Sequence, residues 1–227
     1  MHIPTLIWRE RQSDSPFIES VWTSKALADV SRTVIADPCI SIACIKTNKG
    51  TQVVVTGPST KPYSTLLSRG YTCTTIRFKP GVFLKGMPAG QLTNSSATLP
   101  VAGKSGFRLG KKRLSFPHFD HAEKLVGKLQ RAGYIRYAPP ARIGPEAVGR
   151  LSDRTRFRQT RRATGLSPYQ LYQLQRMHQA VRLIKQGVPA AKVAMELAFV
   201  DQSHLIRASK QFLGHTPRQL SGLPQLP

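Results

Sequence analysis

The amino-acid sequence predicts an α+β protein, with a β-rich N-terminal domain followed by an all-α C-terminal domain. Short β-branched runs that end in Gly and Pro occupy the first hundred residues, whereas later residues repeat apolar side chains at three- and four-residue intervals. The 227 residues carry a net charge of +23 and are 40% hydrophobic. Such a composition places the charge on folded structure and excludes a disordered basic tail.

Three runs predict strands in the N-terminal part. Residues 40–45 alternate in polarity, residues 52–56 end at Gly57-Pro58, and residues 71–78 end at Lys79-Pro80-Gly81. β-Branched residues favour strands, and Gly-Pro pairs terminate them. The strand pattern stops after Pro100.

The charge increases along the chain, from +6 in residues 1–100 to +8 in residues 101–150 and +9 in residues 151–227. Residues 103–118 are rich in Gly and Lys and read as an exposed basic connector. We therefore expect a β-rich sensor or protein-contact domain over residues 1–102, the connector over 103–118 and a helical domain over 119–222.

The helical domain contains several start and stop signals. Leu125, Val126 and Leu129 predict one short apolar helix face that ends at Gly133. A longer helix starts at Ser167-Pro168 and stops near Gly187. Its apolar positions are Leu171, Leu174, Met177, Val181 and Ile184. Shorter helices follow over residues 189–197 and 201–213, with Asp201 as N-cap and Gly214 as the stop.

Two segments of the helical domain repeat at an offset of 49 residues. The matched pairs are Arg158 with Arg207, Arg161 with Lys210, Gly165 with Gly214, Ser167 with Thr216, Pro168 with Pro217, Gln170 with Gln219 and Leu171 with Leu220. An apolar segment precedes each copy, at residues 146–151 and 191–199. A short helix, a turn and a basic second helix form a helix-turn-helix, in which the second helix meets phosphates and base edges.

The alternative is a pair of stacked helical hairpins with a solvated basic face. Five arginines against one acid between residues 151 and 164 argue against it.

These residues resemble a known family. Residues 193–207, with Lys210, Gly214 and Thr216-Pro217, resemble the second helix-turn-helix of AraC/XylS-type transcription regulators, which are bacterial. Residues 152–155, Arg158, Thr164-Gly165 and Ser167-Pro168 resemble the first, and Arg176, Ala180 and Leu183 match the helix between them. The N-terminal stretches 10–17, 21–22, 57–58 and 77–81 are similar to a sensor domain of some such regulators.

The resemblance implies two recognition helices, near residues 153–163 and 202–212, in successive major-groove segments of double-stranded DNA. It implies base contacts from Arg154 and Arg158 in the first helix, and from Gln202, Ser203, His204 and Arg207 in the second. We expect phosphate contacts from Thr155, Arg161, Arg162, Lys192 and Lys210. The family also implies activation through RNA polymerase, a small-molecule or protein effector at the N-terminal domain, and a cytoplasmic location.

Four positions depart from the family pattern. Arg156 stands where Leu is usual, Thr160 and Ser209 stand where Phe is usual, and Ala198 replaces the turn glycine. An alanine with positive φ is strained by roughly 1 kcal/mol. We expect Phe157 to supply the missing apolar bulk through a small rotation of the first recognition helix, which would shift its contacts by one position.

Other function classes receive little support from the residues. No apolar run is long enough to span a membrane, and the start has no secretory signal. We expect no metal and no cofactor, because residues 1–100 contain one histidine, His2, and no phosphate-binding loop; His118 and His121 read as exposed residues at a helix start. Cys39, Cys44 and Cys73 form no C-x-x-C pair, and Cys39 and Cys73 are expected to be small buried strand residues.

Three functions remain open from the residues. The first is a sequence-specific regulator, and the second is a basic architectural protein that binds nucleic acid without specificity. The third, and weakest, is a DNA-repair enzyme with a reactive cysteine, so we expect no enzymatic activity. Trp22, Tyr63, Phe78 and Phe83 suit the core of the β-domain better than an effector pocket, and the effector-binding residues stay unassigned.

Overall fold

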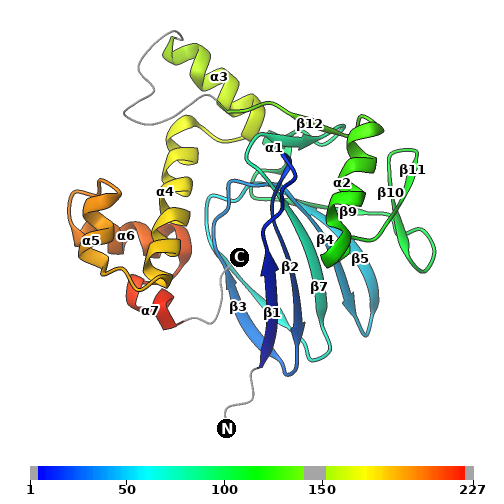
Figure 1. Ribbon diagram of the computed structural model, residues 1–227, viewed down its shortest axis with the longest axis horizontal. Coiled ribbons are helices and arrows are strands. Elements are labelled where there is room, and N and C mark those ends of the chain that lie inside the picture. Colours follow the sequence, from blue (N-terminus) through cyan, green and yellow to red (C-terminus); the bar gives the residue numbers. More distant parts are fainter. Residues whose placement is uncertain (1–4, 141–151, 223–227) are drawn as a thin grey trace.

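A six-stranded antiparallel sheet forms the centre of the β-rich region (Figure 1). The computed structural model describes residues 5–140 and 152–222. The three strands expected from the sequence are confirmed as β4, β5 and β7. In spatial order the sheet consists of β1 (Leu6–Arg11), β2 (Ile18–Ala26), β7 (Thr72–Phe78), β4 (Ser41–Thr47), β5 (Gly50–Thr56) and β9 (Ser96–Leu99).

The two faces of this sheet have different covers, because side chains alternate along each strand. Ile76 and Phe78 of β7 lie in the main hydrophobic core, on the face covered by α2 (Ala122–Arg131). Cys73 and Thr75 of the same strand point to the other face. That second face is covered by the two-stranded antiparallel sheet of β3 (Val30–Val34) and β6 (Tyr63–Leu67).

The segment expected to be an exposed connector is folded, so this expectation was wrong. Residues 103–118 contain a hairpin of β10 (Gly106–Leu109) and β11 (Lys112–Ser115). Phe107, Leu109 and Leu114 of this hairpin are buried in the main core. Strand structure therefore continues well beyond Pro100, and only the basic side chains of the segment are exposed.

Helix α2 confirms the predicted apolar face, with Leu125, Val126 and Leu129 buried and Gly133 at φ +69° after its end. These side chains pack on the sheet and not on the later helices, although the sequence analysis grouped them with the helical domain. The remaining elements of the β-rich region are β8 (Val82–Leu84), which pairs with β12 (Ile135–Tyr137), α1 (Ala89–Leu92) and the short 3-10 helix η1 (Phe119–His121).

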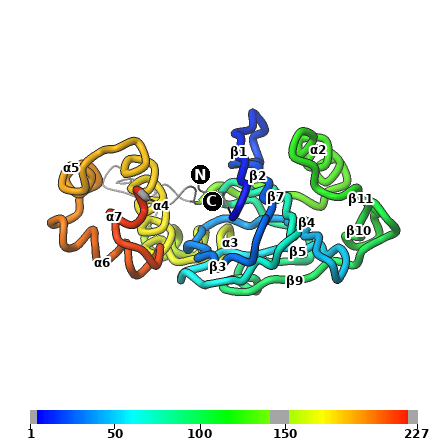
Figure 2. Tube along the Cα trace, turned by 90° about the horizontal axis from the view of Figure 1, so that it is seen from below, coloured from blue at the N-terminus to red at the C-terminus, as the bar shows by residue number. Residues whose placement is uncertain are grey.

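The helical region lies at one end of the molecule, and the β10–β11 hairpin lies at the other (Figure 2). The α+β prediction is thereby confirmed. The region consists of α3 (Asp153–Thr164), α4 (Pro168–Lys185), α5 (Ala190–Glu196), α6 (Gln202–Leu213) and α7 (Pro217–Gly222). All five apolar positions predicted for the long helix are buried in α4. No helix within the described ranges has the length and apolar character needed to cross a bilayer.

The segment after β3 joins the two regions. Ile35 is 1% exposed and belongs to the hydrophobic cluster that also contains Met177 of α4 and Leu205 of α6. The backbone N–H of Ala36 donates to the carbonyl oxygen of Phe212 at 2.9 Å, and the side chain of Ala36 packs with Leu171 and Leu174. The two regions therefore share buried apolar contacts.

Candidate nucleic-acid interface

The two basic helices of the repeat, α3 and α6, begin in the same way. Ser152 caps α3 by accepting a hydrogen bond from the backbone N–H of Thr155, and Asp201 caps α6 by accepting one from His204. These four residues are related by the 49-residue offset. A side-chain oxygen at the N-cap satisfies an N–H that the helix leaves unpaired, and this fixes where each helix starts.

Both helices also end in the same way. Gly165 and Gly214 adopt left-handed conformations, with φ of +74° and +72°. The next helix starts at once in each copy. Ser167 and Gln170 form a capping box before α4, and Thr216 and Gln219 make the equivalent reciprocal bonds before α7. The predicted repeat is thus confirmed at the level of hydrogen bonds.

The C-terminal ends of α3 and α6 both contact the β-rich region. A Cβ added at Gly165 would lie 2.7 Å from the carbonyl oxygen of Ala89, and one at Gly214 would lie 3.1 Å from Cγ2 of Thr33. The N-terminal halves of both helices therefore project away from one supporting body. Helix α4 separates them with 18 residues, or about 27 Å at 1.5 Å per residue, close to the roughly 34 Å of one duplex turn.

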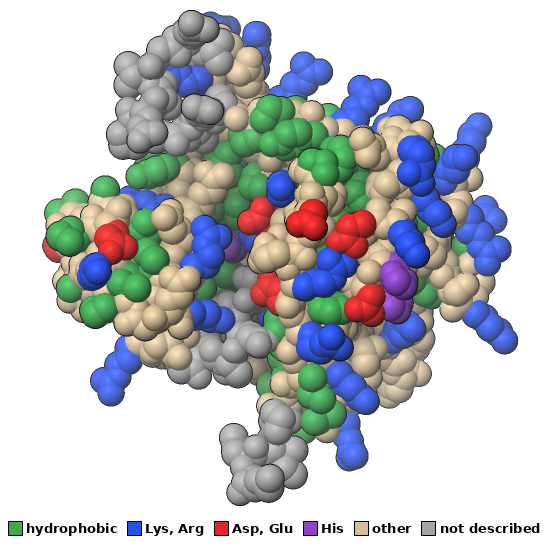
Figure 3. Space-filling model, in the orientation of Figure 1, with side chains coloured by type: hydrophobic (Ala, Val, Ile, Leu, Met, Phe, Trp, Pro, Cys, Tyr) green, Lys and Arg blue, Asp and Glu red, His purple; other side chains and the backbone are tan. Residues whose placement is uncertain are grey.

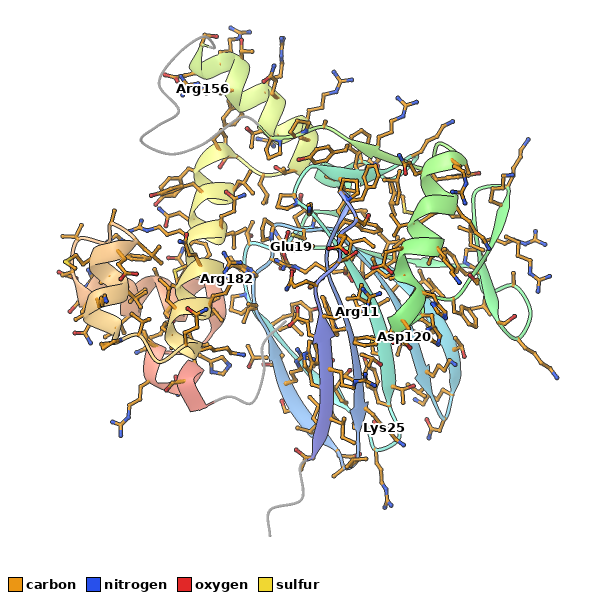
Figure 4. The ribbon with its side chains drawn as sticks, in the orientation of Figure 1. Arg11, Glu19, Lys25, Asp120, Arg156 and Arg182 are labelled. Carbon is orange, nitrogen blue, oxygen red and sulfur yellow. The ribbon has the colours of Figure 1, made fainter. Side chains whose placement is uncertain are left out.

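The exposed side of α3 is strongly basic. Arg154, Arg158, Arg161 and Arg162 are all exposed, and Thr155 is half-buried beside the N-cap. No carboxylate among the described residues lies within 4.0 Å of these four guanidinium groups. Lys and Arg side chains follow the upper edge of the molecule in Figure 3, while most of the acidic side chains on that view gather over the sheet. Figure 4 labels Arg156 near the start of α3.

Helix α6 presents a more mixed polar surface. Gln202, Ser203, Arg207 and Lys210 are exposed, whereas Leu205, Ala208 and Ser209 face the core. Lys192 of α5 is also exposed, and its Nζ lies 3.8 Å from Oε1 of Glu196. An exposed ion pair of this kind is weak and leaves the lysine available for a phosphate.

His204 differs from the other predicted site residues. Its ring packs edge-on against Phe199, with ring centroids 5.4 Å apart, and its Nδ1 accepts a hydrogen bond from the backbone N–H of Val200 at 3.4 Å. These contacts connect the turn after α5 to the start of α6. His204, which occupies the position equivalent to Thr155, therefore stabilises the turn in the second unit.

The expected rotation of α3 is wrong. Phe157 is 44% exposed, whereas Thr160 is fully buried and Arg156 is half-buried near Asp153. The caps of α3 align with those of α6, so its register is that of the repeat and no shift of contacts is needed. Sequence reasoning missed Phe157 as a surface residue. Phe157 lies five residues after the N-cap Ser152, and Ile206 occupies the equivalent position in α6. This equivalence is the signal that could have identified it.

Two other departures have visible consequences. Ala198 has φ of +54°, a conformation that costs an alanine roughly 1 kcal/mol, as the missing turn glycine predicted. Ser209 is fully buried, and its hydroxyl donates to the carbonyl oxygen of His215 at 2.6 Å. The hydroxyl of Thr160, at the equivalent position, has no partner among the described residues. The buried hydroxyl of the first unit therefore lacks the hydrogen bond that its equivalent forms in the second unit.

A polar network links α4 to the β-rich region. Arg77 donates two hydrogen bonds to Asp37, at 2.7 and 2.8 Å. Burial alone would raise the pKa of Asp37, but the Arg77 guanidinium outweighs burial and lowers it. Next to this pair, His178 donates from Nε2 to the carbonyl oxygen of Ala36 at 2.8 Å. Burial and the neighbouring Arg77 lower the pKa of His178 to about 4, so its ring is neutral at pH 7. Arg182 lies on the side of α4 that faces this region (Figure 4).

The cysteines and histidines considered for catalysis or metal binding have structural roles. Cys39, Cys44 and Cys73 are buried free thiols, and burial raises the pKa of each, which disfavours the reactive thiolate. His118 caps η1, and its ring stacks on that of His121. Among residues 5–140 and 152–222 there is no group of three side chains that could hold a metal ion.

Comparison with known families agrees with this geometry. Residues 148–222 match the family model of a helix-turn-helix domain, and residues 15–98 match a domain of unknown function (DUF6597). The apolar segment expected over residues 146–151 lies outside the described residues. No curated protein and no solved structure is significantly similar to the chain. Residues 148–222 therefore form an AraC-type helix-turn-helix domain, and this domain supports a DNA-binding transcription regulator of that type.

Proposed function

We propose that the protein recognises a specific DNA sequence by inserting α3 and α6 into successive major-groove segments on one face of the duplex. This proposal rests on one observation: α3 and α6 both contact the β-rich region at their C-terminal glycines. Because both helices end on the same body, their capped N-terminal halves and exposed polar side chains are free to meet one ligand.

The side chains divide into two roles on chemical grounds. Arg154 and Arg158 of α3, and Gln202, Ser203 and Arg207 of α6, are the proposed base readers. Arginine suits the O6 and N7 acceptors of guanine, and glutamine suits adenine. The proposed phosphate contacts come from Thr155, Arg161, Arg162, Lys192 and Lys210, which would position the protein without reading sequence. His204 moves from the base readers to a positioning role, because its ring is engaged in the turn.

The organisation of the chain supports a regulator more than an enzyme or a packaging protein. A packaging protein needs only charge, whereas Gln202 and Ser203 add hydrogen-bonding groups at the start of α6. The buried thiols argue against a cysteine-dependent repair reaction. We propose activation through RNA polymerase in a bacterial cytoplasm, with an effector at the N-terminal region. We also propose that the DNA-binding unit begins after β12 and not at residue 119, because α2 packs on the sheet.

The test compares two cations of α6 at a cognate site and on random duplex. Replacing Arg207 with Ala should cost about 1–3 kcal/mol at the cognate site and relax base preference there. Replacing Lys210 with Ala should weaken both duplexes to the same degree. Fluorescence anisotropy with both duplexes at fixed salt measures the two affinities. Equal losses on both duplexes from both variants would contradict the division of roles and favour the architectural alternative.

A further inference from the structure

A cavity of about 250 Å³ lies between the second face of the six-stranded sheet and the two-stranded β3–β6 sheet. Trp22, Tyr63 and Tyr71 supply aromatic walls, and Ala43 lies on its floor. Tyr63 and Leu66 are 48% and 70% exposed, so the cavity opens to solvent beside β6. Its volume suits a ligand of roughly eight non-hydrogen atoms, at about 30 Å³ for each.

Among the described residues that line the cavity, Arg32 is the cation, and it forms no ion pair within 4.0 Å, although the more distant Glu10 carboxylate favours its charge. Arg32 of β3 lines the cavity, and its guanidinium carbon lies 4.2 Å above the ring of Trp8. Its Nη2 is buried and has no hydrogen-bond partner among the residues that the structure describes. Burial lowers the pKa of Arg32, which reflects the unfavourable surroundings of the charged form. A buried guanidinium donor without an acceptor is costly, and an anion would relieve that cost.

Asp37 is the carboxylate among the described residues of the cavity wall, and it is already engaged. Asp37 accepts both of its charge-assisted hydrogen bonds from Arg77, so it does not neutralise Arg32. The other polar side chains that line the cavity carry neutral hydroxyl or thiol groups, among them Ser24 and Thr75. The cavity thus has a net positive site within walls that are mainly aromatic and aliphatic. A carboxylate can accept two parallel hydrogen bonds from one guanidinium, and an apolar body fits the walls.

The cavity also shares a wall with the DNA-binding helices. Ile35 lines it and belongs to the cluster that contains Leu205 of α6. Between Ile35 and Asp37, Ala36 bonds both His178 of α4 and Phe212 of α6. A ligand that repositions β3 would therefore act directly on the segment that supports α6.

We propose that this cavity binds a small organic monocarboxylate through Arg32, and that its occupancy changes DNA affinity through residues 35–37. The second part rests on the proposed function, because it requires that α6 bind DNA. The first part is independent of DNA.

The binding test uses straight-chain carboxylates from butyrate to octanoate, each paired with its uncharged amide, in calorimetric titrations at constant ionic strength. We expect saturable binding of at least one carboxylate and at least 10-fold weaker binding of its amide. Arg32→Gln should abolish the preference for the carboxylate, whereas Arg69→Gln, which removes an exposed arginine of the same region, should leave it unchanged. Ala43→Leu should block binding with Arg32 still present.

Three results would overturn the proposed site: binding of no carboxylate, equal binding of carboxylate and amide, or unchanged binding by Arg32→Gln. Circular dichroism of each variant reports whether it is folded, and Ala43→Leu provides a second route if Arg32→Gln is not. The link to DNA is tested by anisotropy of a cognate duplex with and without the carboxylate, where we expect at least a 5-fold change in affinity. An unchanged affinity with the ligand bound would overturn the link alone. Absence of DNA binding both with and without the carboxylate would instead contradict the proposed function.

Discussion

The two helix-turn-helix units share one backbone plan but differ in how they use it. Both α3 and α6 are capped, end at a left-handed glycine and are followed by a capped helix at equivalent positions. In the second unit, the first core position is Leu205, which is fully buried. In the first unit, the equivalent position holds Arg156, and the helix carries five arginines against one acid.

We infer from this difference that the two units contribute differently to stability and to DNA binding. The second unit has an apolar core and exposed amide and hydroxyl groups, which suits reading base edges. In the described part of the first unit, α3 buries no large apolar side chain and carries a higher charge, which suits additional contacts to the phosphate backbone. The comparison predicts that stability depends more on the second unit and that salt dependence depends more on the first.

The largest effect on stability should come from Leu205. Replacing it with Ala removes a fully buried side chain and should destabilise the helical region by about 2–5 kcal/mol. The equivalent change in the first unit, Arg156→Ala, should cost about 1 kcal/mol or less, because that side chain is partly exposed. Thermal unfolding followed by circular dichroism measures both. Equal losses would mean that the two cores contribute alike.

The largest effect on DNA affinity should come from the arginines of α3. Replacing Arg158, Arg161 and Arg162 together with Gln removes two proposed phosphate contacts and one proposed base contact, so the salt dependence of binding should fall by about 1.8 in slope. At 0.1 M salt, affinity for any duplex should fall by about 60-fold. The slope is read from binding isotherms at several salt concentrations.

The β10–β11 hairpin offers a control with the same loss of charge. Arg108, Lys111 and Arg113 are exposed at the far end of the molecule (Figure 2). Replacing these three with Gln should leave the salt slope nearly unchanged. A similar reduction from both triple variants would mean that overall charge, and not the placement of α3, determines binding.

A smaller effect should appear on lowering the pH. The folded-state pKa of His178 is about 4, below its ordinary value of about 6.5, so the unfolded chain binds the extra proton first. The stabilisation from neutral His178 is complete above pH 6.5 and is lost as the pH falls towards 4, by on the order of 2 kcal/mol. Asp37 and Glu123 have lowered pKa values and add their own loss at lower pH, below about 4.5.

Urea unfolding at several pH values between 7 and 4.5 isolates this contribution. His178→Gln, which keeps a neutral polar side chain, should flatten the dependence in that range. His121→Gln provides a control, because that ring is exposed. A full pH dependence in the His178 variant would assign the effect to other groups.

The sequence predicted the parts of the fold that local signals determine. Ser167, Asp201 and Gly214 act through neighbours within a few residues, so their caps and stops are visible without tertiary structure. The β10–β11 hairpin was missed because Phe107, Leu109 and Leu114 are widely spaced among Gly, Lys and Arg. Their burial depends on a sheet formed by distant residues.

The candidate site was predictable where the repeat constrained it and not elsewhere. The exposure of Arg158 and Arg207 follows from their equivalent places after the N-caps. The inward turn of His204 depends on Phe199 and Val200 in three dimensions. The contact of His178 with Arg77 joins residues 101 positions apart, and no local pattern marks it.

Guanine-methylation interference on a cognate operator tests the central claim most directly, namely that α3 and α6 read one face of the same duplex. The account predicts two interfering major-groove segments on one face, about one helical turn of 10–10.5 base pairs apart. Arg158→Ala should remove one segment and Arg207→Ala the other. A single segment that responds to both variants, or two segments on opposite faces of the duplex, would contradict the account.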